Sequence, residues 1–279
     1  MREPVVTARP AMFDLEGHTA FVAGGSRGIG WRIAAQFVEH GGRVTIASRN
    51  FQKCRERADE LNESAGKEVA WPCAFDLADL ASIDAAVAAS AEHWSGLSTL
   101  FANSYFGASG YAHELDPELF AKSLRLNIVH NARLAVAAFP WLRASGRGSA
   151  VFVGSASGLA PSPSVVAYGI AKHGLHELGR DFAVEWGPHG VRSNVLVPGM
   201  TSTDAVERSF SEERQRTLSQ TWPLRRLGNA DEIAAAAIFL ASPGAGFTTG
   251  TVLVCDGGRT LIGGNTAMAL HHGQTSDTP

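Results

Sequence analysis

Strand-like and helix-like segments alternate along this chain, and that alternation constrains the fold more than any other feature. Three short apolar runs near the start are each followed by a helical pattern: residues 19–23 then 29–40, 43–47 then 50–64, and 68–74 then 80–93. Strands that alternate with amphipathic helices predict β-α-β units, in which parallel strands are joined by crossover helices. The first ninety residues therefore predict a parallel sheet with helices on both faces.

The same alternation continues to the C-terminal part of the chain. Further strand-like runs cover residues 98–102, 149–154, 191–197 and 251–254. Further helical patterns cover residues 118–142, 167–186 and 231–240. We expect an α/β protein with a Rossmann-type, doubly wound, seven-stranded parallel sheet, formed by a single dinucleotide-binding catalytic domain at residues 12–262. The polar stretch at about 200–226 is expected to be a flap, and residues 1–11 and 263–279 are expected to be a flexible arm and tail.

Charge and hydropathy exclude several classes of partner. The 24 Lys and Arg residues nearly balance the 27 Asp and Glu residues, and the net charge of −3 comes with no basic block, so nucleic acid is not an expected partner. The longest uncharged apolar runs, at 134–142 and 233–241, have about half the length that a bilayer span needs. The N-terminus lacks the apolar region of a secretory signal. These features predict no membrane partner and a cytoplasmic location.

Cysteine and histidine patterns do not predict a metal site. The three cysteines, Cys54, Cys73 and Cys255, are far apart and form no Cys-x-x-Cys or Cys/His spacing, so we expect reduced thiols. His173 and His176 stand three residues apart on a predicted helix, but no third ligand has a suitable spacing. We therefore expect no metal.

A glycine-rich turn follows the first predicted strand and leads directly into a helix. It reads Ala-Gly-Gly-Ser-Arg-Gly-Ile-Gly over residues 23–30, a G-x-x-x-G-x-G spacing rather than G-x-G-x-x-G. Glycines let the backbone approach a pyrophosphate, and the N-terminus of the helix directs N–H groups and partial positive charge toward the anion. The alternative is an ordinary tight turn. If the turn binds a dinucleotide, its candidate contacts are Gly24, Ser26, Arg27, Gly28, Ile29 and Gly30.

The end of the second predicted strand indicates which dinucleotide would be bound. An acidic residue here would bind a free ribose 2′-hydroxyl, but the chain has Ser48, Arg49 and Asn50. A guanidinium is a planar, multidentate partner for phosphate, and Arg27 in the glycine turn adds a second positive charge. We expect NADP(H) to be preferred over NAD(H). The alternative is that Arg49 is a solvated residue at the start of a helix.

A tyrosine and a lysine four residues apart, with a serine upstream, form a candidate catalytic group. Tyr168 and Lys172 lie on one face of a predicted helix, one turn apart, and Ser155 follows the predicted strand at 149–154. A phenol titrates near pH 10, and a cation held nearby would lower that pKa toward the range useful for general acid–base catalysis. Tyrosine and lysine at this spacing also occur as ordinary surface pairs. It is the added serine that makes a catalytic role the better interpretation.

With these motifs in order, the chain resembles the short-chain dehydrogenase/reductase family, in its compact single-domain branch, from about Phe13 to Gly258. The matching segments are the glycine turn, Asp76-Leu77, Asn103, Asn127, Ser155, Tyr168 with Lys172, Pro198-Gly199 and Asp256-Gly257-Gly258. Any one of these is a weak signal, whereas all of them in this order are a strong one. The resemblance implies interconversion of a carbonyl and an alcohol, with nicotinamide as the hydride carrier.

The resemblance also implies roles for individual residues. Tyr168 would exchange a proton with the substrate oxygen, Ser155 would hydrogen-bond that oxygen, and Lys172 would lower the pKa of Tyr168 and bind the nicotinamide ribose. Asn127 would hold a water molecule that links Lys172 to solvent. The remaining implied cofactor contacts are Asp76 and Leu77 at the adenine, Asn103 beside the adenosine, and Pro198, Gly199, Thr201 and Thr203 at the nicotinamide amide.

Two positions depart from the usual family pattern. Ala23 replaces a threonine whose hydroxyl braces the glycine turn, and Ala-Asn-Ser-Tyr at 102–105 replaces Asn-Asn-Ala-Gly. Tyr105 therefore places an aromatic ring where a glycine usually lets the backbone approach the cofactor. Either cofactor affinity is weakened, or Tyr105 forms a wall of the substrate pocket. The four implied catalytic positions are unchanged.

The substrate expected from the sequence is a hydrophobic carbonyl compound or the corresponding secondary alcohol. The pocket is expected to be lined by the largely apolar residues Phe106, Ala156, Ser157, Leu159, Phe210 and Trp222, the last two of which could instead pack the flap on the body. Some segments, such as Leu227-Gly228-Asn229, resemble the 2,4-dienoyl-CoA reductase branch, which lacks the Tyr-x-x-x-Lys arrangement at this position. The alternatives are a 3-oxoacyl-thioester or enoyl-thioester reductase, or a catalytically silent nucleotide sensor. Apolar helices at 167–186 and 231–240 predict a homotetramer or homodimer.

Overall fold

Seven parallel strands form the central sheet in the computed structural model, which describes residues 12–262. The strands are β1 (Thr19–Ala23), β2 (Arg43–Ser48), β3 (Ala70–Ala74), β4 (Thr99–Ala102), β5 (Ser149–Val153), β6 (Arg192–Pro198) and β9 (Val252–Cys255). Their order across the sheet is β3-β2-β1-β4-β5-β6-β9, and every neighbouring pair is parallel. The chain winds outward from β1 in both directions, so the predicted doubly wound Rossmann-type sheet is confirmed.

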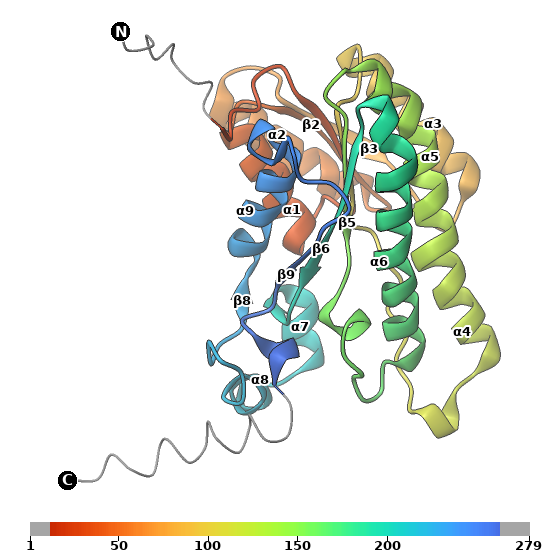
Figure 1. Cartoon of the computed structure of the whole chain (residues 1–279). Helices are drawn as coiled ribbons and strands as arrows, with labels where there is room; N and C mark the ends of the chain where they lie inside the picture. The colour runs from red at the N-terminus through yellow and green to blue at the C-terminus, as the bar shows by residue number, and fades with distance from the viewer. Residues whose placement is uncertain (1–11, 263–279) are drawn as a thin grey trace, which may run out of the picture.

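Helices cover both faces of this sheet (Figure 1). One layer contains α1 (Gly28–Glu39), α2 (Phe51–Ala65) and α9 (Ala230–Ala241). The other contains α3 (Leu80–Trp94), α4 (Pro117–Leu124), α5 (His130–Ala144) and α6 (Val166–Trp186). Each layer buries its own hydrophobic cluster against the sheet. The sheet is therefore buried on both sides, which explains why its strands read as nearly continuous apolar runs.

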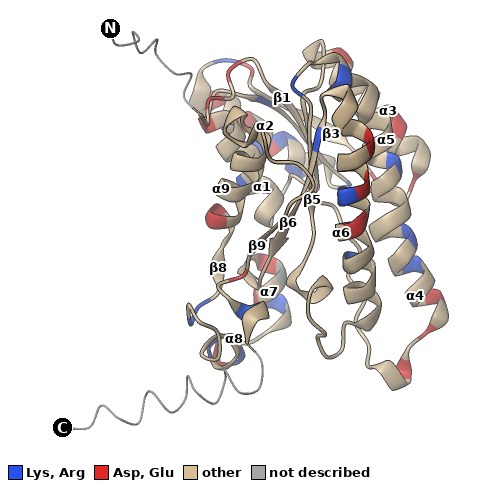
Figure 2. Cartoon of the chain, viewed as in Figure 1, with Lys and Arg blue, Asp and Glu red and all other residues tan. Residues whose placement is uncertain are grey.

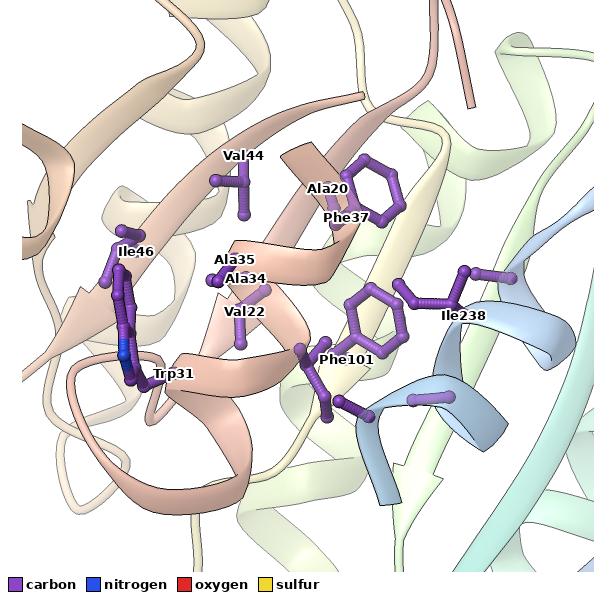
Figure 3. Close-up of a cluster of buried hydrophobic side chains, with 14 of the residues drawn as sticks. Ala20, Val22, Trp31, Ala34, Ala35, Phe37, Val44, Ile46, Phe101 and Ile238 are labelled. Carbon is purple, nitrogen blue, oxygen red and sulfur yellow. The ribbon is translucent and has the colours of Figure 1, made fainter. Parts of the chain in front are cut away.

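The cluster beneath α1, α2 and α9 shows how side chains from separate segments are joined (Figure 3). Phe37 of α1 packs edge-on against Phe101 of β4, with ring centroids 5.9 Å apart, and both side chains are fully buried. Side-chain caps fix where the surrounding helices begin. Asn50 accepts a bond from the Lys53 N–H at the start of α2, and Asn229 forms a capping box at the start of α9.

The helical pattern predicted at 118–142 is interrupted in the structure. A π-helical turn, Arg125–Val129, separates α4 from α5. Within it, the Asn127 side chain donates to the Ser123 carbonyl at 3.0 Å, and the Asn131 side chain donates to the Leu126 carbonyl at 3.0 Å. These side-chain amides bond carbonyls that a regular α-helix would use internally. Turns of this kind occur frequently at functional sites.

The segment predicted as a flap contains regular structure. Its elements are β7 (Thr201–Ser202), α7 (Asp204–Ser209) and α8 (Glu212–Ser219), and β8 (Gly228–Asn229) pairs with β7. The far end of the segment is anchored, because Trp222 is buried and the Leu224 N–H donates to the Gly257 carbonyl at 3.2 Å. Mobility of this segment remains a prediction. The arm and tail predicted at 1–11 and 263–279 lie outside the described residues.

Figure 2 shows acidic and basic positions interspersed along the described part of the chain. None of the described helices has the length and apolarity that crossing a bilayer requires. Within residues 12–262, no three His, Cys, Asp or Glu side chains are grouped so that they could hold a metal ion. The three cysteines are free thiols.

Candidate active site

The residues singled out from the sequence meet at one edge of the sheet. Because the strands are parallel, their carboxyl ends lie together, and each candidate segment follows one of these ends. The segments are residues 24–30 after β1, 48–50 after β2, 76–77 after β3, Asn103 after β4, Ser155 after β5 and 198–203 at the end of β6. The direction of winding reverses between β1 and β4, because the chain returns from β3 past β1 to form β4 on the other side. In doubly wound sheets, ligands bind at the carboxyl edge beside such a reversal.

The glycine turn after β1 requires glycine at several of its positions. Gly24 and Gly28 have φ values of +74° and +55°, which favour glycine. At Gly30, a Cβ atom would lie 2.2 Å from the Gly24 carbonyl oxygen. Arg27 occupies the N-cap position of α1, and its side chain makes no capping bond with any residue that the structure describes. A bare backbone turn beside an uncapped helix N-terminus fits the pyrophosphate of a dinucleotide.

Asn103 braces the glycine turn from the neighbouring strand. Its side-chain amide donates to the carbonyls of Ala23 and Gly24, each at 3.2 Å. The turn therefore receives side-chain support even though Ala23 has no hydroxyl to supply it. Thr203 lies near the turn, since its Cγ2 is 3.5 Å from the position that a Cβ at Gly28 would take.

The predicted adenosine side of the site contains both fixed and free side chains. The Ser48 hydroxyl donates to the Asn50 carbonyl at 3.3 Å and lies 3.0 Å from the buried Cys54 sulfur. After β3, the Asp76 carboxylate accepts from the Ala78 N–H at 2.9 Å. Leu77 is buried, and its carbonyl accepts a 2.6 Å bond from His130 Nδ1. Among the described residues, neither Arg27 nor Arg49 has an ion-pair partner, and both are exposed.

Ser155, Tyr168 and Lys172 form one group next to the glycine turn. Ser155 follows β5, and its hydroxyl lies close enough to the Tyr168 phenol to lower the pKa of that phenol. Lys172, one helical turn beyond Tyr168 on α6, is almost completely buried, and its Nζ donates to the Val153 carbonyl at 2.6 Å. That ammonium nitrogen lies 5.8 Å from the centre of the Tyr168 ring. The three side chains predicted as the catalytic group are thus brought together.

The pKa of Tyr168 departs from the sequence-based expectation. We expect Lys172 to lower it, but in the structure the pKa of the Tyr168 phenol is raised, with burial as the largest cause. The Ser155 hydroxyl lowers the pKa, but not enough to offset burial. Burial also lowers the pKa of Lys172 to about 7, so its positive charge is only partly present at neutral pH. Its hydrogen bond also points to a backbone carbonyl and not to the phenol.

Asn127 lies in the π-helical turn and is fully buried. Its side chain bonds the backbone of Phe106 twice, accepting from the N–H at 3.0 Å and donating to the carbonyl at 2.9 Å. Asn127 therefore fixes the loop after β4, a connection that the sequence pattern did not reveal. The proton-relay role implied by family resemblance remains a prediction.

Tyr105 lies against the catalytic group. Its ring centroid is 5.9 Å from that of Tyr168, edge-on, and Lys172 Nζ is 5.7 Å from its centre. The side chain is 55% exposed. Whether Tyr105 forms a wall of the substrate pocket or weakens cofactor binding is not tested by this position, and both remain predictions.

The other predicted pocket residues divide into two groups. Near Ser155, Ala156 is buried, Ser157 is half-buried and Leu159 is 42% exposed. In the flap segment, Trp222 is buried, and the Arg259 guanidinium lies 5.9 Å from its ring centre. Trp222 therefore packs the flap segment on the body, which is the alternative role considered for it.

We expect the buried Lys172 to make stability depend on pH. Its pKa is about 7 in the folded protein and 10.5 as an ordinary lysine, so between these values the unfolded chain binds more protons. The free energy of unfolding should therefore rise with pH, by up to about 1.4 kcal/mol per pH unit. Urea titrations of the cofactor-free protein between pH 7.0 and 8.5 measure this slope. Lys172→Met should flatten this dependence on pH. An equal slope in that variant would contradict the assignment of the pH dependence to Lys172.

Comparison with known proteins places these features in a family. Residues 23–260 match the family model described as Enoyl-(Acyl carrier protein) reductase. The chain belongs to the short-chain dehydrogenase/reductase family. It is therefore an oxidoreductase of carbonyl and alcohol groups that uses a nicotinamide cofactor, and the family resemblance drawn from its sequence is confirmed.

Individual members show how diverse the substrates of such a short-chain dehydrogenase/reductase are. The chain is 34% identical to galactitol 2-dehydrogenase (L-tagatose-forming) of Cereibacter sphaeroides, over 90% of this chain and 98% of that one. It is 32% identical to a peroxisomal 2,4-dienoyl-CoA reductase of Danio rerio, over 92% and 86%. A solved complex of Pseudomonas aeruginosa RhlG with NADP has a TM-score of 0.84 at 28% identity, covering 90% of this chain and 100% of that one.

Proposed function

We propose that this protein is an NADP(H)-dependent oxidoreductase that interconverts a carbonyl and a secondary alcohol on a hydrophobic small molecule. The observation that carries the proposal is the grouping of Ser155, Tyr168 and Lys172 at the edge of the sheet that also carries the glycine turn. A nucleotide sensor would need only the turn. The presence of a complete proton-transfer group beside it supports a catalyst over a silent protein.

Each side chain of the group has a distinct chemical task in this proposal. The nicotinamide cofactor supplies or accepts the hydride when it is bound. Tyr168 donates its phenolic proton to the carbonyl oxygen in reduction and takes it back in oxidation. Ser155 donates a hydrogen bond to the same oxygen and fixes its position. When protonated, Lys172 places positive charge near the phenol and so favours its ionised form.

NADP(H) is proposed over NAD(H) because of the free cations at the adenosine side. Arg27 and Arg49 have no ion-pair partner among the described residues, whereas Lys53 and Arg57 of α2 are paired with Glu56 and Glu60. A free guanidinium is available for a 2′-phosphate. The solved NADP complex among its structural neighbours is consistent with this preference.

Replacing Arg49 tests the preference directly. We expect NADPH to bind at least tenfold more tightly than NADH, a difference of about 1.4 kcal/mol, and Arg49→Ala to remove most of that difference. Quenching of tryptophan fluorescence measures both affinities. Arg55→Ala is the matched control, because it removes an equal charge from exposed surface of the nearby helix α2. An unchanged preference in Arg49→Ala, or equal affinities in the wild type, would refute the 2′-phosphate assignment.

Reduction of an oxoacyl or enoyl thioester is the second candidate function. It is favoured by the matching family model and by the dienoyl-CoA reductase relative. A 3-oxoacyl thioester needs the same proton donor as a ketone, so Tyr168 could serve both reactions. Product analysis distinguishes enoyl reduction from carbonyl reduction, because an enoyl reductase yields a saturated thioester and no alcohol.

We also propose that the protein acts as a homotetramer or homodimer. Apolar side chains are exposed on the outer surface of the α5 and α6 layer, among them Val129, Val136, Ile170 and Val184. Val184, in the long helix α6, is 78% exposed. Exposed apolar patches of this kind are typical of protein interfaces. A cytoplasmic location likewise remains a prediction.

A further inference from the structure

Two histidines of α6 form hydrogen bonds with the backbone of the turn that carries Ser155. His176 Nε2 accepts a bond from the Ser155 backbone N–H at 3.3 Å, and His173 Nδ1 donates to the Gly158 carbonyl at 2.9 Å. The two contacts lie at opposite ends of the short turn at residues 155–158.

The turn is shaped to receive the His176 ring. A Cβ atom at Gly154 would lie 2.3 Å from His176 Nε2, and one at Gly158 would lie 2.7 Å from its Cε1. Any side chain at either glycine would displace the imidazole. Both glycines have ordinary φ values, so conformation alone does not require glycine there. The contacts therefore show a close fit between the ring and the backbone on both sides of Ser155.

The position of His176 on α6 links Ser155 to the rest of the catalytic group. Tyr168, Lys172 and His176 stand four residues apart in succession, so they share one face of the helix. His176 bonds the Ser155 N–H and His173 bonds the Gly158 carbonyl, so the turn is held by the same helix that carries Tyr168. Movement of the turn relative to α6 is restrained at two points.

The protonation state of His176 suits this contact. The side chain is 4% exposed, and burial, together with the nearby Lys172 and His173, lowers its pKa to about 4. The neutral ring can accept at Nε2 while its proton is on Nδ1, an atom that has no partner among the described residues. A protonated ring would place N–H against N–H. Neutral histidine is therefore the form that holds the turn throughout the physiological pH range.

We propose that His176 is a positioning residue for the reaction, which holds Ser155 at the correct distance from Tyr168 through the Ser155 backbone. This inference rests on the proposed function, because it assigns Ser155 to the reacting oxygen. A displacement of about 1 Å in a positioning contact can lower the rate about 100-fold. His173 supports the same turn at its other end.

Two substitutions separate hydrogen bonding from packing. His176→Gln retains an acceptor near the Nε2 position, and His176→Leu removes it while keeping an apolar side chain. We expect His176→Leu to lower kcat about 10- to 100-fold with the Kd of NADPH unchanged, and His176→Gln to stay within about fivefold of wild type. His18→Leu is the matched control, because His18 is also buried, with an unpartnered Nδ1 and a pKa lowered to about 4, but precedes β1 at the opposite edge.

A second background tests whether the effect passes through Ser155. In Ser155→Ala, His176→Leu should cause little further loss of kcat, whereas a general structural role would lower kcat in both backgrounds. Amide hydrogen exchange of a peptide containing Ser155 gives a readout that needs no turnover. Exchange should be faster in His176→Leu and close to wild type in His176→Gln.

The outcomes separate the two proposals. A wild type that reduces no carbonyl compound would refute the proposed function, while the exchange experiment would still test the contact itself. An active wild type with equal kcat in His176→Leu, or unchanged exchange in that variant, would overturn the positioning role. Equal losses in the Ser155→Ala and wild-type backgrounds would overturn it as well.

Discussion

Tyr168→Phe is expected to lower kcat by about 10²- to 10⁴-fold, the usual contribution of a general acid or base. The variant keeps the ring, and with it the edge-on contact to Tyr105 and the proximity to Lys172. It loses only the hydroxyl, which lies near Ser155 and would exchange the proton. Steady-state rates with NADPH and a panel of hydrophobic ketones measure the loss. The Kd of NADPH should stay within about twofold of wild type, because the glycine turn is untouched.

Tyr111→Phe is the matched control for this experiment. Tyr111 is exposed, and its ring stacks on His113 rather than on the catalytic group. The kcat of Tyr111→Phe should equal that of the wild type. If Tyr168→Phe turned over substrate at the wild-type rate, another group would have to be the proton donor. If the wild type bound NADPH and turned over no carbonyl or thioester substrate, the interpretation as a silent nucleotide sensor would replace the enzymatic one.

Gly30→Ala is expected to abolish cofactor binding at accessible NADPH concentrations and to destabilise the fold. The added methyl group would lie 2.2 Å from the Gly24 carbonyl oxygen and 2.5 Å from the Asn103 side-chain nitrogen. Both the glycine turn and the Asn103 side chain would therefore have to move. Forcing one extra carbon into a packed site typically costs 1–3 kcal/mol, and contact with rigid backbone places this case toward about 3 kcal/mol. Urea unfolding and fluorescence titration measure the two effects separately.

Gly187→Ala provides the control for replacing a helical glycine. Gly187 has right-handed helical angles, φ −52° and ψ −47°, and nothing lies within 4 Å of a Cβ placed there. Alanine restricts the unfolded chain, which favours folding by about 0.4–1 kcal/mol, but Pro188 disfavours helical angles at an alanine that precedes it. We expect these effects to offset one another, so that stability stays within about 1 kcal/mol of wild type. An equally small effect in Gly30→Ala, with NADPH binding intact, would show that the turn is more adaptable than its close packing indicates.

The sheet and helices could be predicted because their apolar patterns are local. The expected strand at 43–47 is found as Arg43–Ser48, and the expected helix at 167–186 as Val166–Trp186. The grouping of the site could also be predicted, since parallel strands bring their carboxyl ends to one edge. The π-helical turn could not, because it depends on contacts between Asn127 and Phe106, which are 21 residues apart.

Interactions set by burial were the least predictable from sequence. The spacing of Tyr168 and Lys172 predicted a lowered phenol pKa, but the spacing does not show how deeply the two groups are enclosed. Likewise, the three-residue spacing of His173 and His176 could be examined only as a possible metal-ligand pattern. Their contacts with the turn at 155–158 depend on the docking of α6 against the end of β5, which no local pattern records.

The close fit between His176 and the two glycines also limits the order in which the three positions can change during evolution. A side chain at Gly154 or Gly158 would collide with the imidazole for as long as His176 is present. His176 would first have to be replaced by a smaller residue, and this replacement would remove the hydrogen bond to the Ser155 N–H. For Gly154, divergence therefore has a preferred first step at position 176. Gly158 stays closed to side chains even after that step, because a Cβ there would also lie 2.8 Å from the His173 backbone nitrogen and 2.9 Å from the Lys172 carbonyl carbon.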